Sequence, residues 1–105
     1  MDANKIWVSE ICWMMYVYIL TNPRKEVLYV GVTNNLRERI RQHEKERGKF
    51  KTFAGRYFCN KLIYFEIFDS PTEAIMREKE IKNMSRISKF ELIKKKNTYL
   101  HFYRM

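Results

Sequence analysis

The sequence is poor in the side chains that bind zinc or form disulfides. It has two cysteines, Cys12 and Cys59, and two histidines, His43 and His101, among 105 residues. None of the four has the CxxC or Cys/His spacing that is typical of a zinc site. Two cysteines are also too few for a disulfide framework, so we expect both to be reduced, partly buried thiols of a cytosolic protein.

Long apolar runs are scarce as well. The run ICWMMYVYIL at residues 11–20 is too short to span a bilayer. It lacks the features of a secretory leader, because no basic segment free of acids precedes it and no small-x-small cleavage site follows before Pro23. We therefore expect the run to lead into a buried strand. No internal repeat or linker interrupts the chain, whose length predicts one domain with a modest core.

Positive charge, in contrast, is abundant. Lysine and arginine total 21 against 12 acidic residues, which gives a net charge of +9 and a pI near 9.7. Hydrophobic residues make up 46% and aromatic residues 15%, a composition typical of a folded domain. A small folded domain this basic indicates a polyanionic partner, with nucleic acid as the first expectation and an anionic membrane surface as the second.

Two segments rich in tyrosine and β-branched residues predict a hairpin. They are Tyr16–Leu20 and Val27–Val32, and the residues between them, TNPRKE, carry turn chemistry. If the loop is symmetric about residues 23 and 24, Tyr18 pairs directly with Tyr29 and both side chains lie on one face of the sheet. A slip of one residue would separate them. Taken alone, such an aromatic pair is typical of a hairpin core.

Helix starts are marked by capping residues. Asn34 or Asn35 can cap a first helix that ends at Gly48. The segment SPTE at residues 70–73 combines a serine cap, a proline at the first helical position and a glutamate three residues after the cap. A similar box, SKFE at residues 88–91, predicts the start of the last helix.

The remaining segments complete the predicted order. Residues 62–68 (LIYFEIF) are almost continuously apolar, which predicts a strand covered on both faces, whereas residues 48–60 show no clear period. The last helix is expected to end near Asn97. The order is β-β-α-β-α-α, an α+β domain in which helices pack against a small sheet.

The first helix carries two kinds of side chain. Leu36 and Ile40 form its apolar stripe, and Arg39 and His43 follow along the edge of that stripe. We expect both to lean toward the sheet, although an arginine here is equally typical of a plain basic face. The opposite flank, toward solvent, carries Arg37 and Arg41.

One carboxylate on the helix after residue 70 is in an unusual place. Ala74 and Ile81 face the core, and Glu78 stands between them. A carboxylate inside an apolar stripe is costly unless it is paired or bound to a metal. The structural alternative is that Glu78 forms a salt bridge with Arg77 or Lys82, or that its side chain extends from the edge of the apolar stripe into solvent.

Together and in order, these residues resemble the GIY-YIG endonuclease superfamily. The motifs are Tyr16-Val17-Tyr18, then Tyr29-Val30-Gly31, then Arg39 with His43, and later Arg77-Glu78. The chain is most similar to the small stand-alone bacterial members, which are related to the N-terminal nuclease domain of an excinuclease. The resemblance covers residues 14–97, and it leaves 1–13 as an N-terminal extension and 98–105 as a C-terminal tail.

The resemblance implies a nuclease site on one face of a three-stranded antiparallel sheet. By match to the motifs, Tyr18 helps to activate the attacking water, and Tyr29 is its partner across the hairpin. Gly31 lets backbone and phosphate come close. Arg39 holds the scissile phosphate and stabilises charge in the transition state, and His43 assists in orientation or proton transfer.

By the same resemblance, Glu78 binds a single divalent cation, Mg²⁺ or alternatively Mn²⁺. The expected function is metal-dependent hydrolysis of DNA, on branched or damaged structures in repair or recombination, in the cytoplasm or at the nucleoid. The alternative is a catalytically weak nucleic-acid-binding module of the same fold, recruited by a protein partner. A membrane-surface or protein-interaction domain would rest on charge alone, and the first helix is unlike a membrane-surface helix.

The expected nucleic-acid track consists of basic residues on and after the first helix: Arg37, Arg41, Lys49, Lys51 and Arg56. Four aromatic residues lie in the same stretch: Phe50, Phe53, Tyr57 and Phe58. We expect at least two of them to fill the core, and an exposed one, such as Phe53 or Tyr57, to be able to stack on an unpaired base.

Overall fold

Strand β1 (Met15–Thr21) lies at the centre of a three-stranded antiparallel sheet, between β2 (Leu28–Thr33) and β3 (Lys61–Phe68). The structure is a computed structural model and describes residues 14–49 and 52–104. The prediction that β3 is covered on both faces holds for its first half, where Leu62–Tyr64 are buried. It fails at Ile67, which is 54% exposed.

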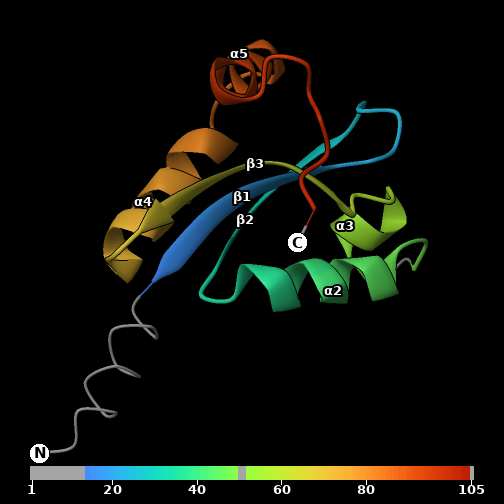
Figure 1. The fold of residues 1–105 in the computed structure, drawn as a ribbon, viewed down its shortest axis with the longest axis horizontal. Coiled ribbons are helices and arrows are strands. Elements are labelled where there is room, and N and C mark those ends of the chain that lie inside the picture. The colour runs from blue at the N-terminus through green and yellow to red at the C-terminus, as the bar shows by residue number, and fades with distance from the viewer. Residues whose placement is uncertain (1–13, 50–51, 105) are drawn as a thin grey trace, which may run out of the picture.

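The described helices are α2 (Leu36–Glu46), α3 (Phe53–Arg56), α4 (Pro71–Lys82) and α5 (Arg86–Lys96). Helices α4 and α5 cover one face of the sheet, and α2 and α3 cover the other (Figure 1). The α+β class and the order β-β-α-β-α-α are confirmed, with α3 as an addition. The side chain of Thr52 caps α3, but this helix is too short to produce a period in the sequence.

Alternation along β1 divides the core into two parts. Val17 and Ile19 pack on the side of α4 and α5, whereas Tyr18 and Leu20 pack on the side of α2 and α3. All four side chains are buried, because β1 has a strand on each side and helices on both faces. The central strand therefore holds the two helical layers together and presents Tyr18 to the α2/α3 layer.

The hairpin register differs from the predicted one. Tyr18 pairs with Gly31, and Tyr29 pairs with Leu20, so the prediction that the two tyrosines are direct partners is wrong. The register is displaced by two residues. Because side chains alternate with a period of two, Tyr18 and Tyr29 still share a face, and their ring centroids are 6.3 Å apart.

The loop between β1 and β2 explains this displacement. The Asn22 side chain accepts hydrogen bonds from the backbone N–H groups of Glu26 (2.7 Å) and Val27 (2.9 Å). The N–H of Lys25 donates to the Asn22 carbonyl, and Lys25 has a positive φ of 60°. These contacts move the centre of the loop one residue toward the C-terminus, away from the assumed symmetry about residues 23 and 24.

Two predicted helix starts are confirmed and the third is wrong. Asn35 caps α2 and Ser70 caps α4. Helix α5 begins earlier than predicted, because its cap is Ser85, whose hydroxyl accepts a hydrogen bond from the N–H of Ser88. The residues on either side of this start, Met84 and Phe90, pack on the core, which favours the earlier cap.

The residues after α5 run back toward β3. Asn97 ends the helix as predicted, and its side-chain amide donates to the carbonyls of Ile63 (2.9 Å) and His101 (2.8 Å). Tyr103 then forms an antiparallel bridge with Leu62. The tail thereby pairs with β3 at one position.

Other expectations concern thiols and membranes. Cys59 is free and buried, whereas Cys12 lies outside the described residues, as does the N-terminal extension 1–13. Across the ranges that the structure describes, no helix is long and apolar enough to cross a bilayer.

Candidate functional site

A close contact between Tyr18 and Gly31 forms the base of the site. The two residues face each other in the hairpin, and the tyrosine ring lies over the glycine. A Cβ atom at Gly31 would come within 2.4 Å of both Cζ and Oη of Tyr18, a distance that real Cβ atoms do not tolerate. The glycine is therefore required by the tyrosine ring, a reason that differs from the close phosphate approach expected from the sequence.

His43 brings a second polar group to the same place. It lies on α2, is buried at 8% exposure, and its Nε2 is 3.1 Å from the hydroxyl of Tyr18. Its ring also packs edge-on against Tyr29, with centroids 5.2 Å apart. The histidine thus leans toward the sheet as predicted. The tautomer of His43 decides which partner donates the hydrogen bond.

The protonation states of this pair follow from burial. Burial lowers the pKa of His43, and the positive charge of Arg39 lowers it further against the opposing effect of Glu46. Burial also raises the pKa of Tyr18 well above its usual range, and the nearby Tyr29 and Glu78 add to this while Arg39 opposes it. At neutral pH the pair is therefore a neutral phenol next to a neutral imidazole.

Arg39 lies one helical turn before His43 on α2 and is exposed to solvent. Its positive charge lowers the pKa of both members of the buried pair, so it interacts electrostatically with both. Across residues 14–49 and 52–104, no carboxylate forms an ion pair with it. The guanidinium can therefore bind an anion without first giving up a partner.

Glu78 lies on α4, which packs on the other face of the sheet from Tyr18. Its side chain is 14% exposed, and its Oε2 is 3.2 Å from Nζ of Lys82, one of the two ion-pair partners considered from the sequence. Its negative charge adds slightly to the raised pKa of Tyr18, so the two residues interact electrostatically. Ala74 and Ile81 are fully buried on the same helix, as predicted.

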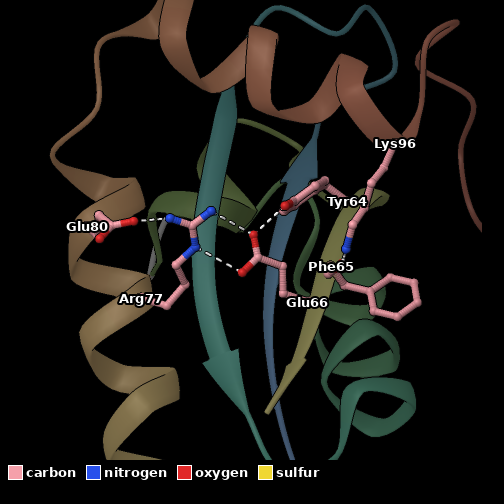
Figure 2. A network of polar contacts seen from close by, with 6 residues as sticks. All are labelled: Tyr64, Phe65, Glu66, Arg77, Glu80 and Lys96. Atoms are coloured by element: carbon pink, nitrogen blue, oxygen red, sulfur yellow. Dashed lines mark hydrogen bonds and ion pairs between the residues drawn. The ribbon is translucent and has the colours of Figure 1, made fainter.

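The neighbouring Arg77 is held by a separate network, shown in Figure 2. Its guanidinium makes two hydrogen bonds to the carboxylate of Glu66 on β3, at 2.9 and 3.0 Å, and also contacts Glu80. The hydroxyl of Tyr64 donates to the same Glu66 carboxylate. This bidentate pair fixes α4 against the sheet and leaves Glu78 to point elsewhere.

The donor set fits one hard divalent cation. In the described part of the chain, no group of three or more histidine, cysteine, aspartate or glutamate side chains could hold a metal ion. A cation at Glu78 would therefore have fewer than three such protein ligands, and water or substrate oxygens would have to complete its shell. Mg²⁺ accepts such a site, whereas Zn²⁺ requires more protein ligands.

The described residues of the predicted nucleic-acid track lie in the α2/α3 layer or beside it. Arg37, Arg41, Lys49 and Arg56 are exposed, and Lys51 is outside the described residues. Arg41 forms an exposed ion pair with Glu38 at 3.0 Å. The structure thus leaves these cations at the surface on the same side of the sheet as Tyr18 and His43.

The aromatic residues of this layer differ from the prediction. Phe53, Tyr57 and Phe58 are each between 44% and 52% exposed, so the expectation that at least two of the four aromatics fill the core is wrong. Phe53 stacks on Tyr29 with centroids 6.4 Å apart and also contacts Tyr57 at 4.8 Å. Sequence reasoning missed this link to the site because it missed α3, whose signal is the cap Thr52 alone.

Comparison with known proteins agrees with this fold. The GIY-YIG catalytic domain family matches residues 14–98, most of the chain. The chain belongs to the GIY-YIG catalytic domain family. Its relatives include UPF0213 proteins.

Two of these relatives come from different organisms. A UPF0213 protein of Clostridium perfringens is 45% identical over 84 residues, which cover 80% of this chain and 87% of the relative. A UPF0213 protein of Natronomonas pharaonis is 40% identical over 78 residues, with 74% and 88% covered. The solution NMR structure of a UPF0213 protein from Bacillus halodurans is similar, with a TM-score of 0.52 and 31% identity, over 82% of this chain and 88% of that one.

Proposed function

We propose that this protein is a metal-dependent endonuclease that hydrolyses phosphodiester bonds of DNA. The proposal rests on the 3.1 Å contact between the Tyr18 hydroxyl and His43 Nε2, in a cluster that also experiences the charges of Arg39 and Glu78. Membership of the GIY-YIG family and a net charge of +9 support a nucleic-acid substrate.

The neutral Tyr18–His43 pair accepts the proton of the attacking water. A tyrosine with a raised pKa is a weak base by itself, but the adjacent His43 is neutral and has a free lone pair at neutral pH. In this proposal Tyr18 passes its own proton to His43 Nε2 as it takes the proton of the water. Because Tyr18 is buried and Tyr29 is partly exposed, the substrate approaches from the side of Tyr29.

Arg39 and Glu78 act on the phosphate. Arg39 binds the non-bridging phosphate oxygens, and its effect grows as negative charge builds up in the transition state. Glu78 holds the divalent cation, Mg²⁺ or Mn²⁺, by its carboxylate. A bound cation would polarise the phosphate and stabilise the leaving oxygen. Lys82, the present partner of Glu78, is half-exposed and can turn to solvent when the cation binds.

A cleavage assay with a matched pair of variants tests the proposal. Linear, nicked, flapped and branched DNA are incubated with protein in Mg²⁺ or in EDTA. Glu78→Gln is expected to abolish Mg²⁺-dependent cleavage. Glu80→Gln, which changes an exposed carboxylate on the same helix, is expected to leave it intact. Equal cleavage by both variants would contradict the role of Glu78.

The alternative function, a nucleic-acid-binding module of the same fold, is separated by the same assay. It has one supporting observation, since Glu78 already has a cationic partner in Lys82. Binding of these DNAs without Mg²⁺-dependent cleavage by the unmodified protein would favour this alternative.

A further inference from the structure

A hollow at the start of β2 lies next to the proposed site, and the proposed reaction does not use it. It has a volume of about 240 Å³ and is lined by Val27, Leu28, Phe53, Arg86 and Lys89. The strand residues and the phenylalanine supply an apolar surface, and the two residues of α5 supply positive charge. The hollow therefore combines an aromatic wall with a cationic wall.

The aromatic wall is connected to the tyrosine cluster. Phe53 is 52% exposed, and it stacks on Tyr29 with an interplanar angle of 25°. Tyr29 in turn packs against His43 and Tyr18. A group that lies against Phe53 in the hollow is thus one aromatic residue away from the catalytic tyrosines.

The cationic wall is available to an anion. The guanidinium of Arg86 lies over the ring of Phe90, 5.3 Å from its centroid, which keeps the charge near the start of α5. Over the described part of the chain, no carboxylate forms an ion pair with Arg86 or Lys89. Two unpaired cations next to an exposed aromatic ring match the chemistry of a nucleotide, which carries a phosphate and a flat base.

We propose that this hollow binds one unpaired nucleotide of a DNA strand, with its base against Phe53 and its phosphate between Arg86 and Lys89. This inference rests on the proposed function and names its substrate class: a strand with an unpaired nucleotide beside the scissile phosphate, such as a flap or a single-stranded end. A base in the hollow is out of the duplex stack. Binding of a fully paired duplex therefore requires one base to be unstacked, which costs free energy.

Binding in EDTA tests the inference without any cleavage. Fluorescence anisotropy measures the affinity of a labelled oligothymidylate and of an abasic oligonucleotide with the same phosphates. Phe53→Ala is expected to weaken oligothymidylate binding about tenfold and to leave abasic binding unchanged, because stacking needs a base. Tyr99→Ala, which removes an exposed aromatic ring of the tail, is the matched control and is expected to change neither. An equal loss for both probes would overturn the stacking role.

A double variant tests the phosphate contact. Arg86→Ala with Lys89→Ala is expected to weaken both probes about tenfold and to flatten the dependence of affinity on salt. The control is Lys94→Ala with Lys95→Ala, which removes the same charge from the last turn of the same helix. If the two double variants lose affinity equally, the cationic wall has no specific role.

The cleavage assay separates this inference from the proposed function. If no DNA is cleaved but oligothymidylate binding depends on Phe53, the endonuclease proposal fails and the nucleotide site stands. If flapped and fully paired DNA are cleaved equally well, and Phe53→Ala alters neither cleavage nor binding, the endonuclease stands and the nucleotide site fails.

Discussion

The two faces of the sheet each bury a tyrosine, and each has an arginine close to it, but they use these residues differently. On the face covered by α4 and α5, Tyr64 and Arg77 share one carboxylate, Glu66, so each of these three polar groups has a partner (Figure 2). On the other face, the hydroxyl of Tyr18 meets His43, and Arg39 has no ion-pair partner among the described residues.

This difference separates residues that stabilise the fold from residues that are free to react. Burial of charged groups is tolerated where their hydrogen bonds are satisfied, as in the Glu66–Arg77 pair. Unpaired charge and partly exposed aromatic rings, as at Arg39 and Phe53, contribute little to folding and are typical of binding surfaces. Paired substitutions across the sheet test this interpretation.

The largest contrast is expected between the two tyrosines. Tyr18→Phe should reduce cleavage about a thousandfold, because it removes the hydroxyl that links the water to His43. Tyr64→Phe should leave cleavage unchanged and destabilise the protein by about 1 kcal/mol, the usual net value of one hydrogen bond. Single-turnover cleavage and urea unfolding measure the two effects. Similar cleavage by both variants would show that Tyr18 is a core residue.

The two arginines should differ in the same sense. Arg39→Ala is expected to reduce the cleavage rate about a hundredfold or more with little loss of DNA affinity or stability, since its contact strengthens in the transition state. Arg77→Ala should destabilise the protein by about 2–3 kcal/mol, because Glu66 is then left partly buried without its partner. If Arg39→Ala loses affinity and rate in equal proportion, Arg39 is a binding residue.

Much of this arrangement was predictable from local sequence. The caps Asn35 and Ser70 act on their own helices, so their effect needs no knowledge of the rest of the chain. The placement of Glu78 between Ala74 and Ile81 follows from the helical period alone. The starts of α2 and α4, and the buried face of α4, were therefore predicted well.

Features that depend on contacts between distant residues were not predictable from local sequence. The hairpin register depends on the side chain of Asn22. The choice of Ser85 over Ser88 as the cap of α5 depends on the packing of Met84 and Phe90 on the core. The contact of Phe53 with Tyr29 joins α3 to β2, and no spacing in the sequence reports it. The local elements were thus easier to predict than the contacts between them.

A smaller contrast is expected between two glycines. Gly31→Ala should reduce cleavage about tenfold to a hundredfold, because the new Cβ displaces the Tyr18 ring from His43, and should destabilise the protein by about 1 kcal/mol. Gly48→Ala should have a similar effect on stability, since Gly48 has a φ of +78°, but should leave cleavage unchanged. Comparable activity of the two variants would show that the Tyr18–Gly31 contact has no role in positioning.

The smallest effect concerns the dependence of stability on pH. Burial lowers the pKa of His43 below its ordinary value of 6.5, so on falling pH the unfolded chain takes up a proton before the folded protein does. The free energy of unfolding should therefore decrease as the pH falls from 7 to 5.5. The decrease should be at most about 1.4 kcal/mol for each unit by which folding lowers the pKa of His43. Glu66, whose pKa is also lowered in the folded state, loses its contribution only below its ordinary value of 4.5, outside this range. Urea unfolding at pH 7.5, 6.5 and 5.5 measures the decrease, which should be smaller in His43→Gln and unchanged in His101→Gln, a substitution at an exposed residue. If His43→Gln and the unmodified protein lose stability in parallel, the imidazole of His43 is not held neutral by burial, and its role as the proton acceptor for Tyr18 must be abandoned.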